Sequence, residues 1–166
     1  SKIKVFTTRP DTLFGVTYLI LSPEHPFVSA FLSSGKVKNK TEVETYILSS
    51  KSKTEIERTT ADREKTGIEL NGLAAINPIN NQKLPIWIAD YVLAGYGTGA
   101  VMAVPAGDQR DWEFAKAFGL DIPSIFEGHN TDEGALTDKD AVLCNSGDWN
   151  GMSCHAALPL SIDGLS

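Results

Sequence analysis

The chain has 166 residues, 42% of them hydrophobic and 22% charged, a balance that provides a real core and excludes a disordered chain. Its apolar runs are shorter than the roughly 18–20 residues that span a membrane, and its start lacks the apolar stretch of a signal peptide. The formal net charge of −6 argues against gripping a long nucleic-acid backbone. Any nucleic-acid contact should therefore be short, such as a single-stranded end. Because the chain opens directly on a strand pattern, we expect one domain, residues 1–166, excised from a larger protein.

The two cysteines, Cys144 and Cys154, form neither a CxxC pair nor a set with a histidine at ligand spacing. This usage predicts an intracellular, reducing environment with no disulfide framework and no structural zinc. We also expect no metal site and no cofactor. Residues 36–65 carry eight of the fifteen Lys and Arg residues together with six acids. We interpret this mixed-charge stretch as a solvated helical face.

The first half of the chain begins with an apolar strand over 2–8 that runs into a turn at Arg9-Pro10-Asp11. A second, buried strand is predicted over 13–21, where apolar and β-branched residues dominate. The Ser22-Pro23 pair is typical of a helix start. Helices are then predicted over 24–33, 41–50 and 52–59.

The second half is predicted to continue with strands and one amphipathic helix, followed by a turn-rich tail. The predicted strands cover 66–77, 84–93 and 100–104. Helix 108–118 has an apolar face that includes Trp112 and Ala115. The tail should hold short strands between glycine turns and a last helix that starts at Ser153. This irregular mixture predicts an α+β fold with a barrel-like mixed β-sheet core and surrounding helices.

Three polar clusters could carry chemistry. Thr7, Thr8, Arg9, Asp11 and Thr12 crowd one strand end, where hydroxyls suit a carbonyl, a ribose or a bound water, although a capped turn explains them equally. The loop 95–99 (GYGTG) allows close approach of a ligand, but it matches neither phosphate-loop motif.

In the third cluster, Asp108 and Asp111 share a helix face in a first helical turn, which fits an N-cap as well as an ammonium-binding carboxylate. Arg110 between them could pair with either acid. No Ser-His-Asp or Cys-His set is visible, so a covalent nucleophile has no good candidate.

Three segments in the right order, TTRPDTLFG (7–15), GYGTGAVMAVPAGDQRDWEFA (95–115) and NSGDWNGM (145–152), resemble the editing domain (connective peptide 1) of bacterial and organellar leucyl-tRNA synthetases. The resemblance covers nearly the whole chain. It implies a barrel-like domain inserted into a class I synthetase. The implied activity is the hydrolysis of mischarged tRNA-Leu, such as norvalyl- and isoleucyl-tRNA, without ATP chemistry in this piece. Such a second, hydrolytic selection step is needed because a binding pocket can distinguish two amino acids that differ by one methylene by only about 1–3 kcal/mol.

Residue by residue, the resemblance implies that Asp111 holds the substrate ammonium and that Thr7 and Thr8 surround the scissile ester and its water. Thr12 corresponds to the threonine that excludes leucine. The remaining positions correspond to substrate-binding residues of the adenosine pocket, the side-chain pocket and their borders: Arg9, Tyr96, Met102, Val104, Asp108 and Arg110.

One position departs from the family pattern: Gly107 stands where a histidine usually precedes the first aspartate of this segment. This departure keeps a second hypothesis open, a catalytically weakened module that only binds the tRNA 3′ end. A valyl- or isoleucyl-type editing domain is the third. The implied partners are the 3′-terminal adenosine of the aminoacylated tRNA and the rest of the synthetase in cis. We expect a monomer without membrane contact, in the cytoplasm or an organelle.

Overall fold

The computed structural model describes residues 2–157, which divide into two compact units. The first, here called the sheet unit, comprises residues 2–6, 18–76 and 82–102. The second, here called the helix-loop unit, comprises residues 7–17, 77–81 and 103–157. Each unit is described by itself.

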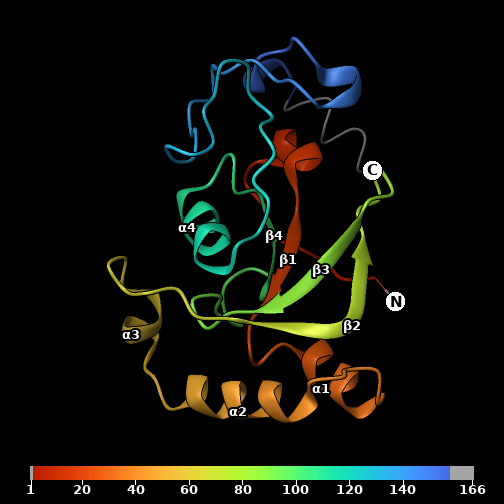
Figure 1. The fold of residues 1–166 in the computed structure, drawn as a ribbon, viewed down its shortest axis with the longest axis vertical. Coiled ribbons are helices and arrows are strands. Elements are labelled where there is room, and N and C mark those ends of the chain that lie inside the picture. Colours follow the sequence, from red (N-terminus) through yellow and green to blue (C-terminus); the bar gives the residue numbers. More distant parts are fainter. Residues whose placement is uncertain (1, 158–166) are drawn as a thin grey trace. The chain divides into compact units, whose positions relative to one another are not determined.

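The sheet unit is built on four strands, coloured red to green in Figure 1. They are β1 (Tyr18–Leu21), β2 (Ile68–Ile76), β3 (Lys83–Ile88) and β4 (Ala100–Ala103), in the order β2-β3-β1-β4. β1 and β3 run parallel, with Leu19 opposite Ile86, whereas β2 and β3 run antiparallel. The predicted α+β class with a mixed sheet is therefore confirmed. The sheet is open, not barrel-like, because β2 and β4 are its edges and four strands are far fewer than the eight of small closed barrels.

One predicted strand is absent, and two others are shorter than expected. Residues 2–8 contain no assigned strand, although the Phe6 amide donates to the Ala100 carbonyl at 3.1 Å. The strand expected over 13–21 begins only at Tyr18, because a 3-10 helix, η1 (Pro10–Gly15), comes first with Pro10 pre-set for its first turn. β3 ends at Ile88 rather than at residue 93, since the chain turns with the Val92 amide bonded to the Ala89 carbonyl.

The helices expected in the first half are confirmed within a few residues as α1 (Pro26–Ser33), α2 (Lys40–Lys51) and α3 (Glu55–Thr59). α3 starts with a capping box in which Thr54 and Glu57 bond each other's backbone amides. In Figure 1, α1 and α2 lie alongside β2. Val28 and Val43 from these helices share one apolar cluster with Leu70 and Ile88 of the sheet.

The N-cap of α1 provides a pH-dependent contact, since Nδ1 of His25 accepts the Phe27 amide at 3.1 Å. Partial burial lowers the pKa of His25, so the folded chain holds the ring neutral and the unfolded chain binds the proton more readily. The free energy of unfolding should therefore fall by about 0.5–1 kcal/mol as the pH drops through the unfolded pKa of about 6.5, and level off below the folded pKa. Urea unfolding at pH 7.5 and 5.5 measures this drop. His25→Asn keeps a capping acceptor that does not titrate in this range, so this variant should not show the drop. An equal drop in both proteins would contradict the conclusion that His25 causes it.

The helix-loop unit holds η1, the predicted amphipathic helix as α4 (Gln109–Phe118), and a long irregular tail with η2 (Gly147–Trp149). The short strands expected in the tail are reduced to two isolated bridges, Phe126 with Leu143 and Val142 with Ser153. Residues 154–157 are helical, as expected for a helix from Ser153, and the residues that follow lie outside the described part of the chain.

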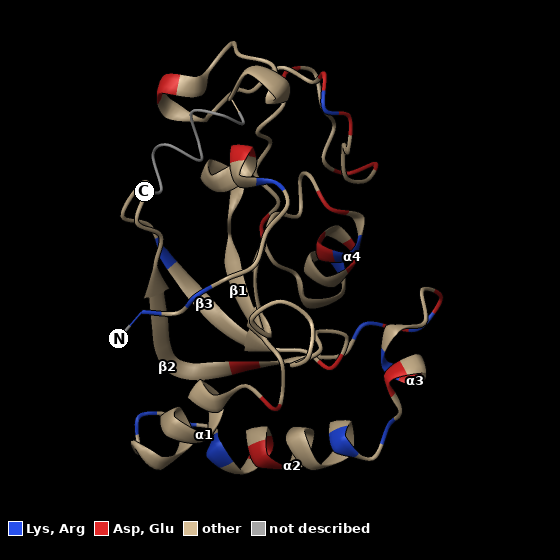
Figure 2. Cartoon of the chain, turned by 180° about the vertical axis from the view of Figure 1, so that it is seen from behind, with Lys and Arg blue, Asp and Glu red and all other residues tan. Residues whose placement is uncertain are grey.

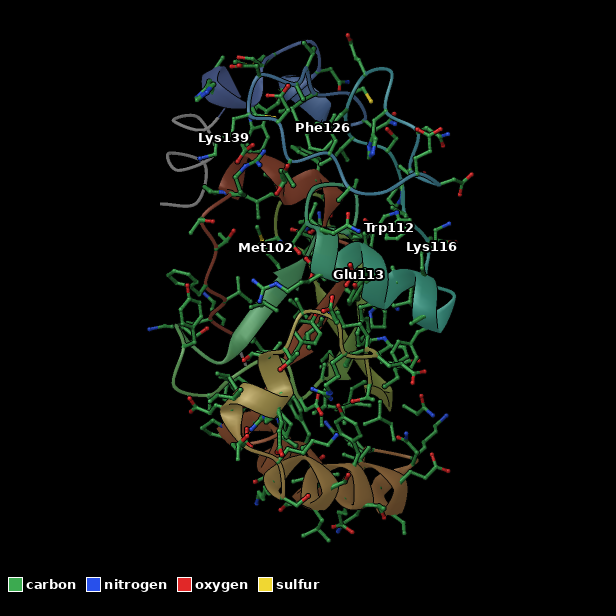
Figure 3. All side chains as sticks on the ribbon, turned by 90° about the vertical axis from the view of Figure 1, so that its left-hand side faces the viewer. Met102, Trp112, Glu113, Lys116, Phe126 and Lys139 are labelled. Carbon is green, nitrogen blue, oxygen red and sulfur yellow. The ribbon has the colours of Figure 1, made fainter. Side chains whose placement is uncertain are left out.

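Two side chains fasten α4 to the tail. The indole Nε1 of Trp112 donates to the Thr131 carbonyl at 2.7 Å, and Lys116 Nζ lies 3.1 Å from an Asp132 oxygen. Figure 3 shows Trp112 and Lys116 projecting from the same helix. Within the tail, Phe14 of η1 packs edge-on against Trp149 at 5.1 Å between ring centroids. The unit is thus held by aromatic and polar contacts rather than by strand pairing.

Candidate functional site

The threonine-rich segment forms a tight turn at the start of the helix-loop unit. The Thr7 hydroxyl accepts the Arg9 amide at 2.9 Å, and the Thr12 hydroxyl donates to the Arg9 carbonyl at 2.8 Å. Thr12 is only 3% exposed, whereas Thr8 is exposed. The proton of the Thr7 hydroxyl is not used in its bond to the Arg9 amide, so this hydroxyl and that of Thr8 can donate to a ligand.

An ion pair inside the same turn joins Arg9 to Asp11, which is 1% exposed. The contact is bidentate: Nε lies 3.0 Å from Oδ1, and Nη2 lies 2.8 Å from Oδ2 of the carboxylate. The hydrogen bond to Asp11 raises the pKa of Arg9. Burial, and then the negative charge of Asp11, raises the pKa of the Cys154 thiol. Arg9 therefore stays charged with its charge compensated, and Cys154 is a neutral thiol.

The first turn of α4 contains both predicted aspartates. Asp108 is the N-cap, and its Oδ1 accepts the Asp111 amide at 3.1 Å. Oδ2 of Asp111 accepts the Val104 amide at 3.0 Å, and the Asp111 side chain is 8% exposed. The capping interpretation of Asp108 is confirmed. Asp111 is a buried acceptor as well as a helix-start carboxylate, while Arg110 is exposed.

Gly107 lies between β4 and this helix start, beside two apolar side chains. A Cβ at this position would lie 3.5 Å from Phe126 Cζ and 3.5 Å from Val104 Cγ1, ordinary contact distances, and the backbone has no left-handed conformation that demands glycine. Val104 itself is 5% exposed. Residue 107 therefore has room for a side chain.

The structure brings most of the predicted residues into one unit. Thr7, Thr8, Arg9 and Thr12 belong to the helix-loop unit, as do Val104 and the 108–111 turn. Tyr96 and Met102 belong to the sheet unit, where Tyr96 is 70% exposed and Met102 is 8% exposed. The roles of these two residues stay predictions from the resemblance.

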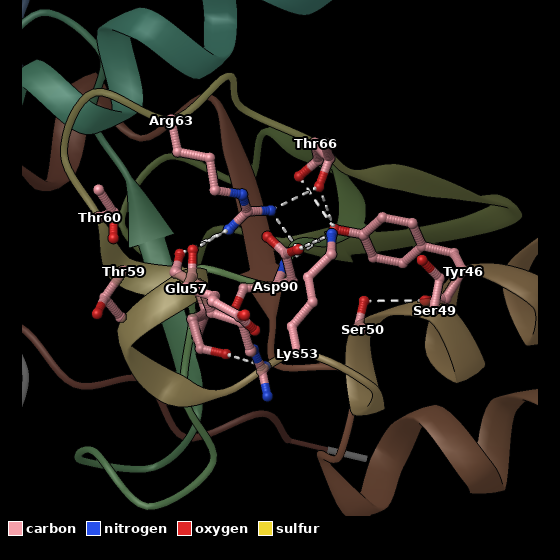
Figure 4. Close-up of polar contacts among 12 residues, drawn as sticks. Tyr46, Ser49, Ser50, Lys53, Glu57, Thr59, Thr60, Arg63, Thr66 and Asp90 are labelled. Carbon is pink, nitrogen blue, oxygen red and sulfur yellow. Dashed lines mark hydrogen bonds and ion pairs between the residues drawn. The ribbon is translucent and has the colours of Figure 1, made fainter.

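Sequence reasoning missed the polar network around Asp90, which is 1% exposed (Figure 4). Its carboxylate pairs with Arg63 and, at 3.0 Å, with Lys53 Nζ, while Arg58 Nε donates to its carbonyl at 2.5 Å. Arg58 also pairs with Glu24 at 2.8 Å, which lowers the pKa of that carboxyl against the opposing effect of its burial. The interpretation of residues 36–65 as a solvated face is therefore wrong for these three cations, which turn inward to acids remote in sequence.

Asp90→Ala should lower the free energy of unfolding by about 2 kcal/mol, because two partly buried cations lose their carboxylate partner. Asp132→Ala is the matched control, since it breaks a single ion pair whose side chains are 43% and 85% exposed. That variant should lose less than about 1 kcal/mol. Urea unfolding of both variants compares the two losses, and equal losses would show that burial does not strengthen the Asp90 network.

Within residues 2–157, no group of three or more His, Cys, Asp or Glu side chains is placed to hold a metal ion. In the same part of the chain, no helix is long and apolar enough to cross a membrane. Both cysteines are free thiols. The threonine and aspartate turns themselves supply hydroxyls, carboxylates, backbone amides and the Arg9 guanidinium.

Comparison with known proteins gives a consistent answer. The family model of the leucyl-tRNA synthetase editing domain matches residues 1–165. A leucine–tRNA ligase of Roseiflexus castenholzii is 51% identical over 153 residues, which are 89% of this chain and 16% of that protein. A solved ternary complex of an Agrobacterium radiobacter K84 LeuRS with tRNA and LeuAMS is similar with a TM-score of 0.61 and 35% identity, over 79% of this chain and 16% of that chain. The chain spans about one sixth of these relatives, and it belongs to the editing-domain family of leucyl-tRNA synthetases.

Proposed function

We propose that this chain hydrolyses the ester bond of mischarged tRNA-Leu, with norvalyl- and isoleucyl-tRNA as its substrates. The observation that supports this most is the buried Asp111 carboxylate in the first turn of α4, which accepts the Val104 amide, while the Asp111 backbone amide donates to Asp108. A carboxylate held in place can bind an α-ammonium group without reorganising. The carboxylate would anchor the amino acid, and the ester carbonyl would then lie at a fixed distance from Asp111.

The proposed reaction is direct attack of water on the ester carbonyl carbon, followed by cleavage of the bond to the ribose oxygen, which leaves as a hydroxyl. Thr7 and Thr8 would orient the water or donate to the carbonyl oxygen as it gains negative charge. Arg9, held by Asp11, would supply positive charge at the turn without leaving its place. A ribose hydroxyl next to the scissile bond could help to deliver the water, so no covalent enzyme intermediate is required.

A panel of mischarged tRNAs tests the proposal in the synthetase that carries this chain. Hydrolysis of norvalyl- and isoleucyl-tRNA-Leu, with leucyl-tRNA-Leu spared, is the expected result. Binding of the tRNA 3′ end without hydrolysis would instead favour the weakened binding module. Preferred hydrolysis of threonyl-tRNA-Val or valyl-tRNA-Ile would favour the valyl- or isoleucyl-type alternatives.

We further propose that residues 1–166 form one editing domain inserted in a larger synthetase, which acts in cis with it. The proposed ligand is the 3′-terminal adenosine of the aminoacylated tRNA, and no cofactor takes part. By the resemblance, Tyr96, Met102 and Val104 would each contact the adenosine or the amino-acid side chain. Asp108 and Arg110 would border the ammonium site.

Gly107→His should raise the deacylation rate of isoleucyl-tRNA-Leu or tighten its binding, without changing which amino acid is rejected. The Cβ of the added histidine would make ordinary contacts with Phe126 and Val104, and residue 107 directly precedes the Asp108–Asp111 turn, while selectivity is expected from Thr12 and the apolar wall. Single-turnover deacylation of isoleucyl- and leucyl-tRNA-Leu measures both rates. A changed Ile/Leu ratio at an unchanged isoleucyl rate would contradict this division of roles. A slower rate with histidine would show that Phe126 has repacked around glycine.

A further inference from the structure

The N-terminal segment of the sheet unit has two different faces. Ile3 and Val5 pack against the apolar core, whereas Lys2, Lys4 and Phe6 are exposed. Alternate residues of an extended segment point to the same side, so these three side chains form one outward row at intervals of roughly 7 Å. Two lysines therefore lead along the surface to an aromatic ring.

At its aromatic end, the row contains a pair of rings in contact. The rings of Phe6 and Tyr96 meet edge to face, with 5.8 Å between centroids and an interplanar angle of 78°. The backbone fixes Phe6 through its amide bond to the Ala100 carbonyl, and a Cβ at Gly97, whose φ is +58°, would lie 2.7 Å from Phe6 Cβ. Glycine thus allows the loop to pack closely on Phe6. The two rings nevertheless remain 43% and 70% exposed.

The two segments that carry these rings have positive charges only. Residues 2–6 carry two lysines and no acid, and residues 91–102 carry no charged side chain, in a chain whose net charge is −6. Figure 2 shows the N-terminal segment with blue and without red as far as η1. Exposed aromatic rings beside cations are what single-stranded nucleic acid requires, because bases stack on the rings and phosphates pair with the cations. A protein partner would normally need a wider apolar patch than two rings.

We infer that Lys2, Lys4 and Phe6 form a track for the single-stranded nucleotides that precede the terminal adenosine of the tRNA, which Tyr96 would contact. A base stacks on Phe6, and the lysines neutralise the phosphates behind it. Phe6 directly precedes Thr7, one of the proposed catalytic residues, in the chain. This inference rests on the proposed function, and it adds binding residues beyond the terminal adenosine.

The test compares two substrates of the synthetase that carries this chain: isoleucyl-tRNA-Leu and isoleucyl-adenosine, which lacks the preceding nucleotides. Phe6→Ala should raise KM for the tRNA by about five- to a hundred-fold, the loss expected for one stacked base, and by clearly less for the adenosine ester. Phe6→Trp keeps a stacking face and should restore the tRNA value. Leu48→Ala, at a helix residue that is 70% exposed, controls for the loss of exposed apolar surface and should change neither KM.

Salt dependence tests the lysines separately. Replacing Lys2 and Lys4 by glutamine should reduce the slope of log Kd against log salt by about 0.7 for each lost phosphate contact. If the unsubstituted enzyme hydrolyses neither substrate, the proposed function fails. If it hydrolyses both, the track is overturned by a Phe6→Ala variant that changes the two substrates equally or leaves both unchanged. Rescue by Phe6→Leu as complete as that by Phe6→Trp would also overturn it, because leucine cannot stack.

Discussion

Asp111→Ala should slow the hydrolysis of isoleucyl-tRNA-Leu by about 30- to 1000-fold, corresponding to about 2–4 kcal/mol of transition-state stabilisation. The proposed reason is the loss of the charge that holds the substrate ammonium. Single-turnover deacylation by the synthetase that carries this chain measures the effect. With the enzyme in saturating excess over the tRNA, this assay reports the hydrolysis step without contributions from tRNA binding or product release.

The contact of Asp111 Oδ2 with the Val104 amide makes this alanine variant less stable as well, because a buried N–H loses its acceptor. That loss should lower the free energy of unfolding by about 1–3 kcal/mol. Asp111→Asn is the matched variant, since an amide oxygen can still accept the Val104 N–H but carries no charge. We expect Asn to be the more stable variant and nearly as slow as Ala. An Asn variant that clears isoleucyl-tRNA-Leu at the normal rate would refute the ammonium assignment.

Thr12→Ala should make the enzyme hydrolyse its own correct product, leucyl-tRNA-Leu, about tenfold faster or more. A buried β-branched side chain can reject the γ-branch of leucine by steric clash, and Thr12 is 3% exposed. The decay of leucyl-tRNA-Leu in the presence of enzyme measures the change. Unchanged stability of this product would contradict the steric role.

Two further substitutions separate the shape of Thr12 from its hydrogen bond to the Arg9 carbonyl. Thr12→Val keeps the branched shape and loses the hydroxyl, so a steric wall should still spare leucyl-tRNA-Leu. Thr12→Ser keeps the hydroxyl and loses the methyl, so leucine should be admitted. The reverse pattern would show that Thr12 acts by holding the turn, and that the leucine-excluding surface lies elsewhere.

How well the sequence predicted each contact of the site depended on how far apart the two partners lie in the chain. The Asp108 cap and the placement of Asp111 in a first helical turn involve residues three apart, and both were predicted. The bond from Asp111 to the Val104 amide joins a helix to the strand before it, and spacing alone did not indicate it. Even the Arg9–Asp11 pair, two residues apart, was missed as an ion pair, because the spacing does not indicate that Asp11 is buried.

The sequence by itself determined the local structure of this protein. Capping pairs such as Thr54 with Glu57, helix periodicity and proline positions act within one or two turns, so α1, α3 and α4 were predicted close to where they form. The three motif segments, in their order, also indicated the family.

Only the tertiary structure decided the open order β2-β3-β1-β4, the early end of β3 and the network at Asp90. Asp90 meets Arg63 and Lys53 across 27 and 37 residues, and Asn77 donates to the Leu13 carbonyl across 64. Such contacts form only when packing removes water from both partners, and burial then decides whether a charged residue turns inward. A local pattern carries no information about that burial, so it did not indicate that Lys53, Arg58 and Arg63 turn inward from a mixed-charge stretch.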